Sequence, residues 1–256
     1  MIPQPIESAH NTHFKRWRSL LDSRGIKKQG QFLLSGRKTV PEALARHPGR
    51  FHAVLCESET QLEAFLCLPA GLAAYRLPRQ LFRELDVIGT GAPLLVGSLP
   101  SLPRADLATP PQGVELACAL GNPDNLGAVL RSAAAFGVRR VILLEGAAHP
   151  FHPRALRAGA NAQFELELQQ GPSWTGLVGA AGPLIGLDAQ GEPLAGFDWP
   201  DELRLVLGEE GQGLPPDLEL RRLAIPMTGA VESLNATIAA SVALFSCFSA
   251  RAAGTA

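Results

Sequence analysis

The sequence predicts an α/β protein of two domains, and three observations lead to this class. Strand-like runs such as VELACAL and RRVILLE alternate with helix-like runs such as NLGAVLRSAAAFG. Strands of the second half are apolar throughout, which is typical of a mostly parallel sheet buried on both faces. Between the two halves, the segment SLPSLPRADLATPPQG has four prolines and no apolar periodicity, so it predicts a linker over residues 99–113.

The first, smaller α/β domain is expected over residues 1–98. In FKRWRSLLDS the residues Phe14, Trp17, Leu20 and Leu21 recur at helical spacing, which predicts a helix with its aromatic side chains in the core. After it we expect a strand in QFLLSG, a helix in KTVPEALAR and a strand in FHAVLCE. The alternation continues with the helix QLEAFLCL, the extended segment AAYRLP, the helix RQLFREL and the strand PLLVGSL.

The second domain is expected over residues 114–256. It begins with the strand VELACAL, the helix NLGAVLRSAAAFG and the strand RRVILLE, followed by the helix HPRALRAGA, the strand FELEL and the helix SWTGLVGAA. Three further strands, PLIGLDA, LRLVLGEE and RLAIPM, precede a long helix in ESLNATIAASVALFSCFSARAA. This alternation predicts a parallel sheet with helices on both faces.

Composition limits the classes of protein to which the chain can belong. A hydrophobic content of 46% with 18% charged residues is sufficient for a sizeable core. No apolar run approaches the ~20 residues that span a bilayer, and the N-terminus has no signal-peptide pattern, so we expect a cytoplasmic protein without a membrane contact. The cysteines lie apart among apolar neighbours, which favours buried thiols over a metal site. They are Cys56, Cys67, Cys118 and Cys247.

Charge is distributed unevenly along the chain. Residues 1–50 contain ten Lys and Arg against three Asp and Glu, whereas residues 51–256 contain thirteen against twenty-one. A basic segment on an otherwise acidic protein is typical of a contact with a polyanion, because neutralised phosphates supply much of the affinity for nucleic acid. An ordinary solvated helix face explains the same charges equally well.

Ligands of open α/β sheets bind beyond the carboxyl ends of the strands, and three segments at such positions stand out. The first is NPDNLGAVLRSAAAFGV, in which Asn122, Asp124 and Asn125 are typical of a turn and a helix cap. Capping explains this polar cluster fully. It explains Arg131 less well, because a single arginine among small apolar residues more often pairs with an anion.

The second segment, LVLGEEGQGL, places Gly208, Gly211 and Gly213 around two carboxylates after a strand. A tight turn needs one glycine, and three of them let a ligand approach the backbone. The third segment, IPMTGAVESLNATIAASVAL, places Ser233 and Asn235 at the start of an Ala-rich helix, where they cap it or present donors to an anion or a ribose. Neither the dinucleotide-binding G-x-G-x-x-G nor the P-loop G-x-x-x-x-G-K-[ST] is present.

These three segments, in this order, resemble the signature motifs of the SpoU-type RNA 2'-O-ribose methyltransferases, the TrmH family of the SPOUT superfamily. The resemblance covers residues 114–256. The N-terminal segment SAHNTHFKRWRSLLDSRGIKKQGQFLLSGRKTVPEAL is similar to the RNA substrate-binding domain that many of these enzymes carry, which has a ribosomal-protein-like α/β fold.

The resemblance implies a C-terminal trefoil-knot methyltransferase domain, S-adenosyl-L-methionine as cofactor, no metal, and a homodimer. Carried over by position, the residues that match the family's catalytic set are Asn125, Arg131, Glu210, Ser233 and Asn235. The residues that match its cofactor-binding set are Gly208, Ile225 and Leu234, joined by Gly186 and Leu187 after the strand PLIGL.

Three alternatives remain beside ribose methylation. They are a knotted methyltransferase that modifies a base, a non-catalytic RNA-binding homologue, and a nucleotide-dependent oxidoreductase, which lacks its fingerprint. The N-x-G-x-x-x-R and SLN patterns favour ribose, and the N-terminal domain favours ribosomal over transfer RNA by analogy. Candidates for holding RNA phosphates are then Lys15, Arg16, Arg18, Lys27, Lys28, Arg37 and Lys38.

Overall fold

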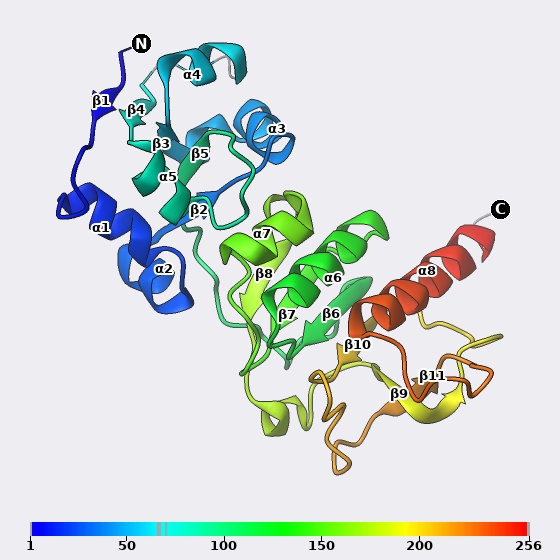
Figure 1. Cartoon of the computed structure of the whole chain (residues 1–256). Coiled ribbons are helices and arrows are strands. Elements are labelled where there is room, and N and C mark those ends of the chain that lie inside the picture. Colours follow the sequence, from blue (N-terminus) through cyan, green and yellow to red (C-terminus); the bar gives the residue numbers. More distant parts are fainter. Residues whose placement is uncertain (1, 66–67, 70, 255–256) are drawn as a thin grey trace. The chain divides into compact units, whose positions relative to one another are not determined.

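The computed structural model describes residues 2–65, 68–69 and 71–254, and Figure 1 colours them in sequence order. The chain divides into two compact units. Unit 1 comprises Met1–Ser101 and His149–Asn161, and unit 2 comprises Leu102–Ala148 and Ala162–Ala256. Unit 1 therefore includes a segment that follows a strand of unit 2, which the order of elements along the chain does not indicate.

The elements of unit 1 form an α/β fold on a mixed sheet. In chain order they are β1 Gln4–Pro5, α1 Thr12–Ser19, α2 Ser23–Gln29, β2 Gln31–Leu34, α3 Thr39–Arg46, the 3₁₀ turn Pro48–Arg50, β3 Phe51–Cys56, α4 Glu59–Phe65, β4 Ala73–Arg76, α5 Arg79–Leu85, β5 Leu94–Ser98 and α7 Pro153–Gly159. The strand order is β1-β4-β3-β5-β2. β4 runs parallel to β1 and β3, whereas β5 is antiparallel to β3 and β2.

The helices of unit 1 follow the sequence prediction except at α2. Phe14 and Trp17 of α1 are 0% and 3% exposed, which confirms that both aromatic side chains belong to the core. The apolar pattern does not predict α2, which begins because Asp22 accepts hydrogen bonds from the amides of Arg24 and Gly25 and ends at Gly30 with a φ of +62°. In the predicted helix QLEAFLCL, residues 66–67, and Cys67 with them, lie outside the described residues.

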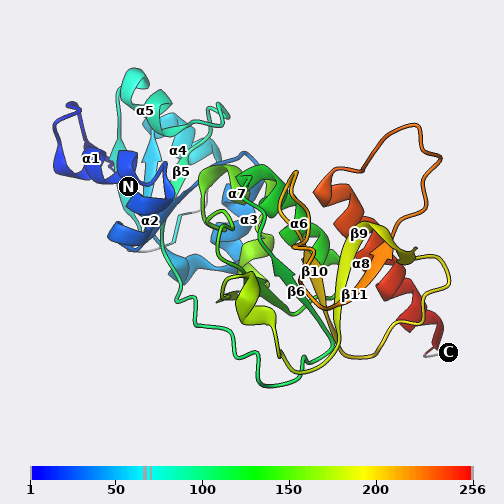
Figure 2. The same cartoon turned by 90° about the horizontal axis from the view of Figure 1, so that it is seen from below.

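Unit 2 contains a six-stranded sheet with every neighbouring pair parallel, as the sequence predicts. Its elements are β6 Val114–Cys118, α6 Pro123–Ala135, β7 Arg140–Leu143, the 3₁₀ turn Ala162–Phe164, β8 Glu167–Gln170, the 3₁₀ turn Trp174–Leu177, β9 Leu184–Pro193, β10 Leu203–Leu207, β11 Arg221–Ala224 and α8 Ala236–Gly254. The strand order is β11-β9-β10-β6-β7-β8. Helices α6 and α8 lie side by side (Figures 1 and 2).

Local sequence explains where these two helices begin. The side chain of Asn122 caps α6 by accepting a hydrogen bond from the amide of Asp124, and Pro123 takes the first helical position, where a missing amide costs nothing. Asn235 caps α8 in the same way, because its side chain accepts from the amide of Thr237 at 2.8 Å.

Three expectations for unit 2 are corrected. SWTGLVGAA forms only a 3₁₀ turn, because Gly179, two residues after the turn ends at Leu177, adopts a φ of +78°. This turn covers the sheet face built by Ala117, Ile142 and Val206. The last helix begins at Ala236 rather than within ESLN, because Asn235 is its cap. Strand β11 ends at Ala224, so Ile225, Pro226 and Met227 of the predicted strand RLAIPM lie outside it.

A buried ion pair lies at the amino ends of the central strands. Arg204 of β10 and Glu115 of β6 are register partners, and their side chains are 0% and 1% exposed with 2.8 Å between nitrogen and oxygen. The same guanidinium donates to the carbonyls of Thr109 and Ala181, each at 2.6 Å. The network therefore anchors the predicted linker to the sheet at the edge away from the strand carboxyl ends.

Candidate active site

Segments from four parallel strands meet at one edge of the unit 2 sheet. The carboxyl ends of parallel strands share an edge, so the residues after β6, β10 and β11 converge there with residues 187–189 of β9, which follow Gly186, the last β9 residue paired with β10. They line a cavity of about 540 Å³, within the roughly 300–1,000 Å³ that is usual for small-molecule sites. The predicted site residues that line this cavity are Asn125, Leu187, Gly208, Glu210, Ile225, Ser233, Leu234 and Asn235.

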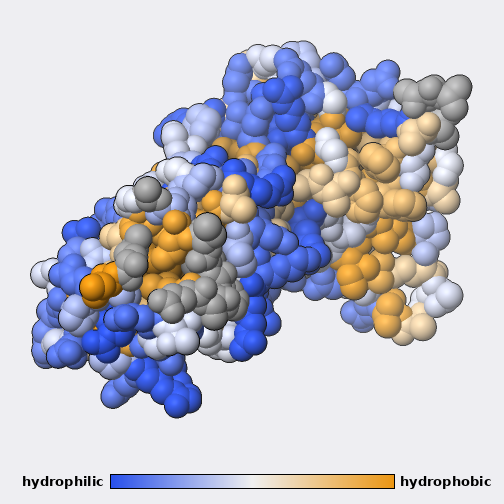
Figure 3. All heavy atoms as spheres, turned by 90° about the horizontal axis from the view of Figure 1, so that it is seen from above, coloured by the Kyte–Doolittle hydropathy of each residue, from blue (hydrophilic) through white to orange (hydrophobic). Residues whose placement is uncertain are grey.

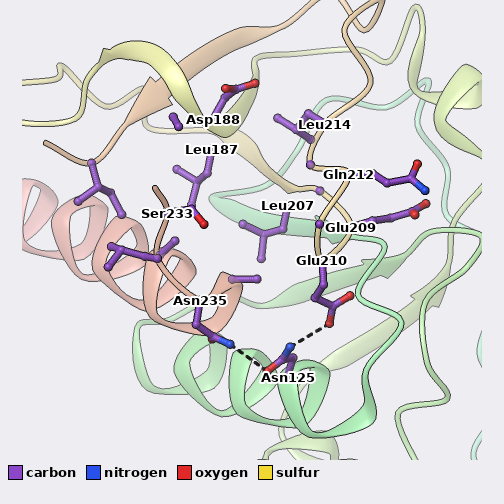
Figure 4. A pocket seen from close by; sticks show the side chains of 18 of the residues that line it. Asn125, Leu187, Asp188, Leu207, Glu209, Glu210, Gln212, Leu214, Ser233 and Asn235 are labelled. Carbon is purple, nitrogen blue, oxygen red and sulfur yellow. Dashed lines mark hydrogen bonds between the residues drawn. The ribbon is translucent and has the colours of Figure 1, made fainter. Parts of the chain in front are cut away.

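A chain of hydrogen bonds joins the three motif segments in this cavity (Figure 4). The side-chain amide of Asn125 donates to Glu210 Oε1 at 3.0 Å. The side-chain oxygen of Asn125 accepts from the side-chain amide of Asn235 at 3.4 Å. Thr237 Oγ1 donates to the backbone carbonyl of Asn125 at 3.3 Å. Asn125 therefore connects the glycine-rich loop after β10 with the start of α8.

Glu210 is held as an anion at the start of α6. Its carboxylate accepts the amide of Gly121 at 3.0 Å and that of Asn122 at 3.2 Å, in addition to the Asn125 side chain. Burial alone would raise the pKa of Glu210, but the hydrogen bonds from Asn125 and the two backbone amides outweigh burial and hold this pKa below its ordinary value. The positive end of the α6 dipole favours the same charge.

Two of the predicted glycines are required by close packing. At Gly208 a Cβ atom would lie 2.2 Å from the carbonyl carbon of Gly213, so the loop after β10 closes only over a glycine. At Gly186 a Cβ atom would lie 2.4 Å from Leu214 Cδ1. Gly208 lines the cavity, whereas Gly186 does not and instead contacts Leu214, which does.

Arg131 is the predicted catalytic residue that a single chain does not bring into the cavity. Its side chain is exposed on α6 and forms no hydrogen bond or ion pair within the part of the chain that the structure describes. At the end of the same helix, the ring of Phe136 contacts those of Phe245 and Phe248 on α8, with centroids 5.8 and 6.0 Å away. The exposed side chain of Arg131 thus lies on a helix that packs against α8.

Four polar residues at the site were not predicted from the sequence, and one of them, Gln212, lines the cavity in the loop after β10. Asp188 and Glu209 line the cavity, and Thr237 contacts Asn125 from α8. Glu209 Oε1 accepts a hydrogen bond from the ring nitrogen of Trp174 at 3.4 Å. Only their position in the sequence could have indicated Asp188 and Glu209. Asp188 directly follows Leu187 near the end of the predicted strand PLIGLDA, and Glu209 precedes Glu210 in the glycine-rich loop.

The sequence predicts neither a metal site nor a contact with a membrane. No group of three or more His, Cys, Asp or Glu side chains among the described residues is placed to hold a metal ion. No helix in this part of the chain is long and apolar enough to cross a membrane. Cys56, Cys118 and Cys247 are free and buried, which confirms the prediction for these three thiols, and burial raises the pKa of Cys118 to about 12.

Sequence comparison places the motif segments in a known family. Residues 116–245 match the model of the SpoU rRNA methylase family. The chain belongs to this SpoU family. The resemblance found in the sequence is thereby confirmed, and the match spans the strands and loops of unit 2 that line the cavity.

Named relatives of this SpoU protein include two ribosomal RNA methyltransferases. It is 38% identical, over 94% of its length, to the ribosomal RNA small subunit methyltransferase G 2 of Syntrophobacter fumaroxidans, and it spans 48% of that longer relative. It is 30% identical to the 23S rRNA (guanosine(2553)-2'-O)-methyltransferase of Bacillus subtilis, and the match covers 94% of this chain and 97% of the relative.

A solved structure has the same fold. The SpoU methyltransferase AviRb from Streptomyces viridochromogenes, in complex with AdoMet, has a TM-score of 0.78 with this chain at 24% identity. The match covers 95% of this chain and 99% of the AviRb chain, so the likeness in fold extends over both units.

Proposed function

We propose that the protein transfers a methyl group from S-adenosyl-L-methionine to a ribose 2'-hydroxyl of RNA, with ribosomal RNA as the substrate. The observation that carries the proposal is the convergence of three motif segments on one cavity, where Asn125 links Glu210 to Asn235. The Bacillus subtilis relative, matched over nearly its whole length, is named as a 2'-O-methyltransferase of 23S rRNA. That name supports ribose over base, and ribosomal over transfer RNA.

The lining of the cavity fits the proposed cofactor. Leu187, Ile225 and Leu234 supply apolar surface, and Gly208 lines the cavity with backbone atoms alone. We expect the cofactor to contact the backbone at Gly208, Ile225 and Leu234. When bound, it supplies a methyl group on a positively charged sulfur, and no metal is needed because the leaving thioether is neutral.

The residues of the chain must then position a weakly acidic hydroxyl and stabilise the charge that develops as it loses its proton. We expect Ser233 and Asn235 to orient the ribose, with Asn125 and Glu210 fixing the amide of Asn235. Arg131 holds the neighbouring phosphate and stabilises the developing oxyanion. A guanidinium stays protonated in proteins, so Arg131 does not act as the base, and the proton leaves through a neighbouring group or water.

The proposed active form is a homodimer in which Arg131 of one subunit completes the cavity of the other. On one face of α8, Ile238, Val242, Phe245 and Phe248 are exposed by 53%, 36%, 56% and 47%. Figure 3 shows apolar side chains gathered over this region. A contiguous apolar face of this kind is typical of a protein–protein contact, and Arg131 is exposed on the adjacent α6.

Mixed dimers test this arrangement. Arg131→Ala and Asn235→Ala should each abolish most of the turnover as separate homodimers. If Arg131 acts across the interface, one site of each mixed dimer has both residues, so an equal mixture recovers about a quarter of the wild-type activity. If Arg131 acts within its own chain, the mixture recovers none.

Unit 1 is proposed to bind the phosphates of RNA and to have the ribosomal-protein-like fold of a substrate-binding domain. All seven basic residues named above are exposed. Arg18 pairs with Glu84 and Lys38 with Glu42, whereas Lys15, Lys27 and Lys28 pair with no carboxylate among the described residues. Replacing these three lysines by glutamine should weaken RNA binding and lower the slope of log affinity against log salt by about one per lost phosphate contact. Cofactor affinity should stay unchanged.

The knot and the cellular location complete the proposal. The chain passes from β11 through residues 225–235, beside the loop after β10, and then into α8, which contacts α6. A trefoil knot requires the chain to pass through an earlier loop, and the return beside the loop after β10 is the part of that path on which the proposed knot rests. The cytoplasm is the proposed location, because the proposed substrate is found there.

The decisive experiment identifies the methylated atom. Purified protein is incubated with S-adenosyl-L-methionine and unmethylated ribosomal RNA, and the digested RNA is examined by mass spectrometry, as is RNA from cells with and without the gene. We expect a 2'-O-methylated nucleotide, and turnover that falls for both Arg131→Ala and Arg131→Lys. A methylated base would favour the base-modifying alternative, and RNA binding without turnover would favour a non-catalytic homologue.

A further inference from the structure

Strand β9 contains a large bulge at the wall of the cavity. Its pairing with β11 changes from Gly186–Arg222 to Glu192–Leu223, so residues 187–191 leave the ladder between two consecutive residues of β11. Leu187, Asp188 and Ala189 of this bulge line the cavity. The part of β9 that faces the proposed cofactor is therefore not held by pairing with β11.

The side chain of Arg222 holds this bulge from the β11 side. Its Nη1 donates to Asp188 Oδ2 at 2.6 Å, while Asp188 Oδ1 accepts the amide of Gln190 at 3.0 Å. Nη2 of Arg222 donates to three backbone carbonyls of the loop that follows β10. These are the carbonyls of Pro215 at 2.7 Å, Leu218 at 3.4 Å and Pro216 at 3.5 Å. The side chains of Arg222 and Asp188 are 22% and 26% exposed, so water screens this ion pair less than it screens a surface pair.

The loop held by Arg222 forms a second wall of the cavity. Leu214 lines the cavity directly before Pro215, and it packs so closely on Gly186 that a Cβ atom there would lie 2.4 Å from Leu214 Cδ1. One guanidinium thus joins the bulge of β9 to the loop after β10, and both segments face the ligand.

We propose that Arg222 is a positioning residue for the cofactor, which sets the distance between the Leu187–Ala189 wall and the Leu214 wall. Arg222 does not itself line the cavity, so it acts through Asp188 and the carbonyls of the loop. The inference rests on the proposed function, because the ligand of this cavity is the proposed cofactor.

Arg221 provides a matched control on the same strand. It forms an ion pair with Glu192, which also belongs to β9, and its guanidinium lies 4.5 Å from the ring centroid of Phe197. Its side chain is 56% exposed, and neither Arg221 nor Glu192 lines the cavity. Because successive strand residues point to opposite faces, Arg221→Met removes the same charge and the same kind of partner on the side away from the cavity.

The experiment compares the wild type with Arg222→Met, Arg222→Lys and Arg221→Met. Calorimetric titration with S-adenosyl-L-methionine gives the Kd, and steady-state kinetics at saturating cofactor give kcat. For Arg222→Met we expect a Kd about tenfold higher, about 1.4 kcal/mol, with kcat within about twofold of the wild type. Arg222→Lys should lie between the two, because an ammonium keeps the charge but cannot reach Asp188 and the loop carbonyls together. Arg221→Met should keep the wild-type Kd.

Every other result of this experiment either refutes the inference or overturns the proposed function. An unchanged Kd for Arg222→Met refutes the inference. A second result also refutes it: Arg222→Met binds with a lower stoichiometry and melts at a lower Tm, but the folded fraction keeps the wild-type Kd. In that case Arg222 stabilises the fold and does not position the cofactor. If Arg222→Met does not fold, Arg222→Lys decides by the same criteria. A wild-type protein that binds no S-adenosyl-L-methionine would overturn the proposed function itself, and the inference with it.

Discussion

Replacing Glu210 by Gln tests the hydrogen-bond chain of the site with almost no change in side-chain shape. Oε1 of Glu210 accepts the amide of Asn122 and the side chain of Asn125, and Oε2 accepts the amide of Gly121. A glutamine has one oxygen, so it keeps the two Oε1 bonds only by turning its NH₂ group toward the Gly121 amide, where two donors oppose each other. At least one hydrogen bond to a charged acceptor is therefore lost.

The magnitude follows from the environment of Glu210. A hydrogen bond to a charged group contributes about 1.5–3 kcal/mol, and screening of this exposed side chain lowers the expected loss to about 1–2 kcal/mol. A stability loss of this size lowers Tm by roughly 2–8 °C. If the same amount, about 1–2 kcal/mol, is lost from stabilisation of the transition state, because Asn125 and Asn235 are less well positioned, kcat/KM falls about 5- to 30-fold.

The pH dependence has a definite sign. Hydrogen bonds hold the pKa of Glu210 below its ordinary value in the folded protein, and the unfolded value is about 4.3. The carboxylate therefore contributes stability that is fully present above about pH 4.3 and is lost as the pH falls through the folded pKa. The difference in Tm between the wild type and Glu210→Gln should be constant from about pH 7 to pH 5 and shrink below about pH 4.

Thermal melts and transfer of a radiolabelled methyl group to ribosomal RNA measure both effects. Glu219→Gln is the control, because it removes the same charge from an exposed residue that does not line the cavity. If Glu210→Gln matches this control in Tm and turnover, the hydrogen-bond chain through Asn125 does not organise the site.

Three further substitutions probe the cofactor loop, the dimer and the buried ion pair. Gly208→Ala places a Cβ atom 2.2 Å from a backbone carbon and should raise the cofactor Kd about 5- to 100-fold by calorimetry, whereas at Gly49 a Cβ atom meets nothing within 4 Å and Gly49→Ala should be neutral. Phe245→Glu should convert a dimer to monomers in sedimentation, whereas Val178→Glu, at an apolar side chain exposed by 71% outside α8, should not. Glu115→Ala leaves a buried guanidinium unpaired and should lower the free energy of unfolding by about 3–5 kcal/mol in urea titrations.

The sequence predicts the position of the site well because each motif follows a strand. Apolar runs such as those of β6 and β10 define buried parallel strands, and the carboxyl ends of such strands meet at one edge. Asn125, Glu210 and Asn235 therefore come together although 110 residues separate the first from the last. The start of α8 is harder to predict, because the segment ESLNATIAA is compatible with a helix throughout. Only the hydrogen bond to the side chain of Asn235 marks the residue after which the helix begins.

Features that depend on distant contacts are not visible in local patterns. PLIGLDAQGEP has the composition of a continuous strand and its turn, whereas in the structure β9 bulges and Asp188 of the bulge pairs with Arg222, over thirty residues later. The residues 149–161 belong by sequence order to the second half, yet they cluster with unit 1, where the side chain of Asn161 donates to the carbonyl of Thr39 at 2.9 Å. No periodicity encodes such a contact.

The contact between α6 and α8 links the site to the apolar face of α8. From the cavity, Thr237 bonds to Asn125, and one turn further along α8 the hydroxyl of Ser241 meets that of Ser132 at 2.7 Å. Ser132 directly follows Arg131, and Ser241 directly precedes Val242 on the apolar face. A second subunit on that face would therefore fix the same helix pair that positions Asn125. The cofactor wall at Leu187 and Gly208 depends on the sheet instead, so a monomeric variant should lose turnover while keeping most of its affinity for the cofactor.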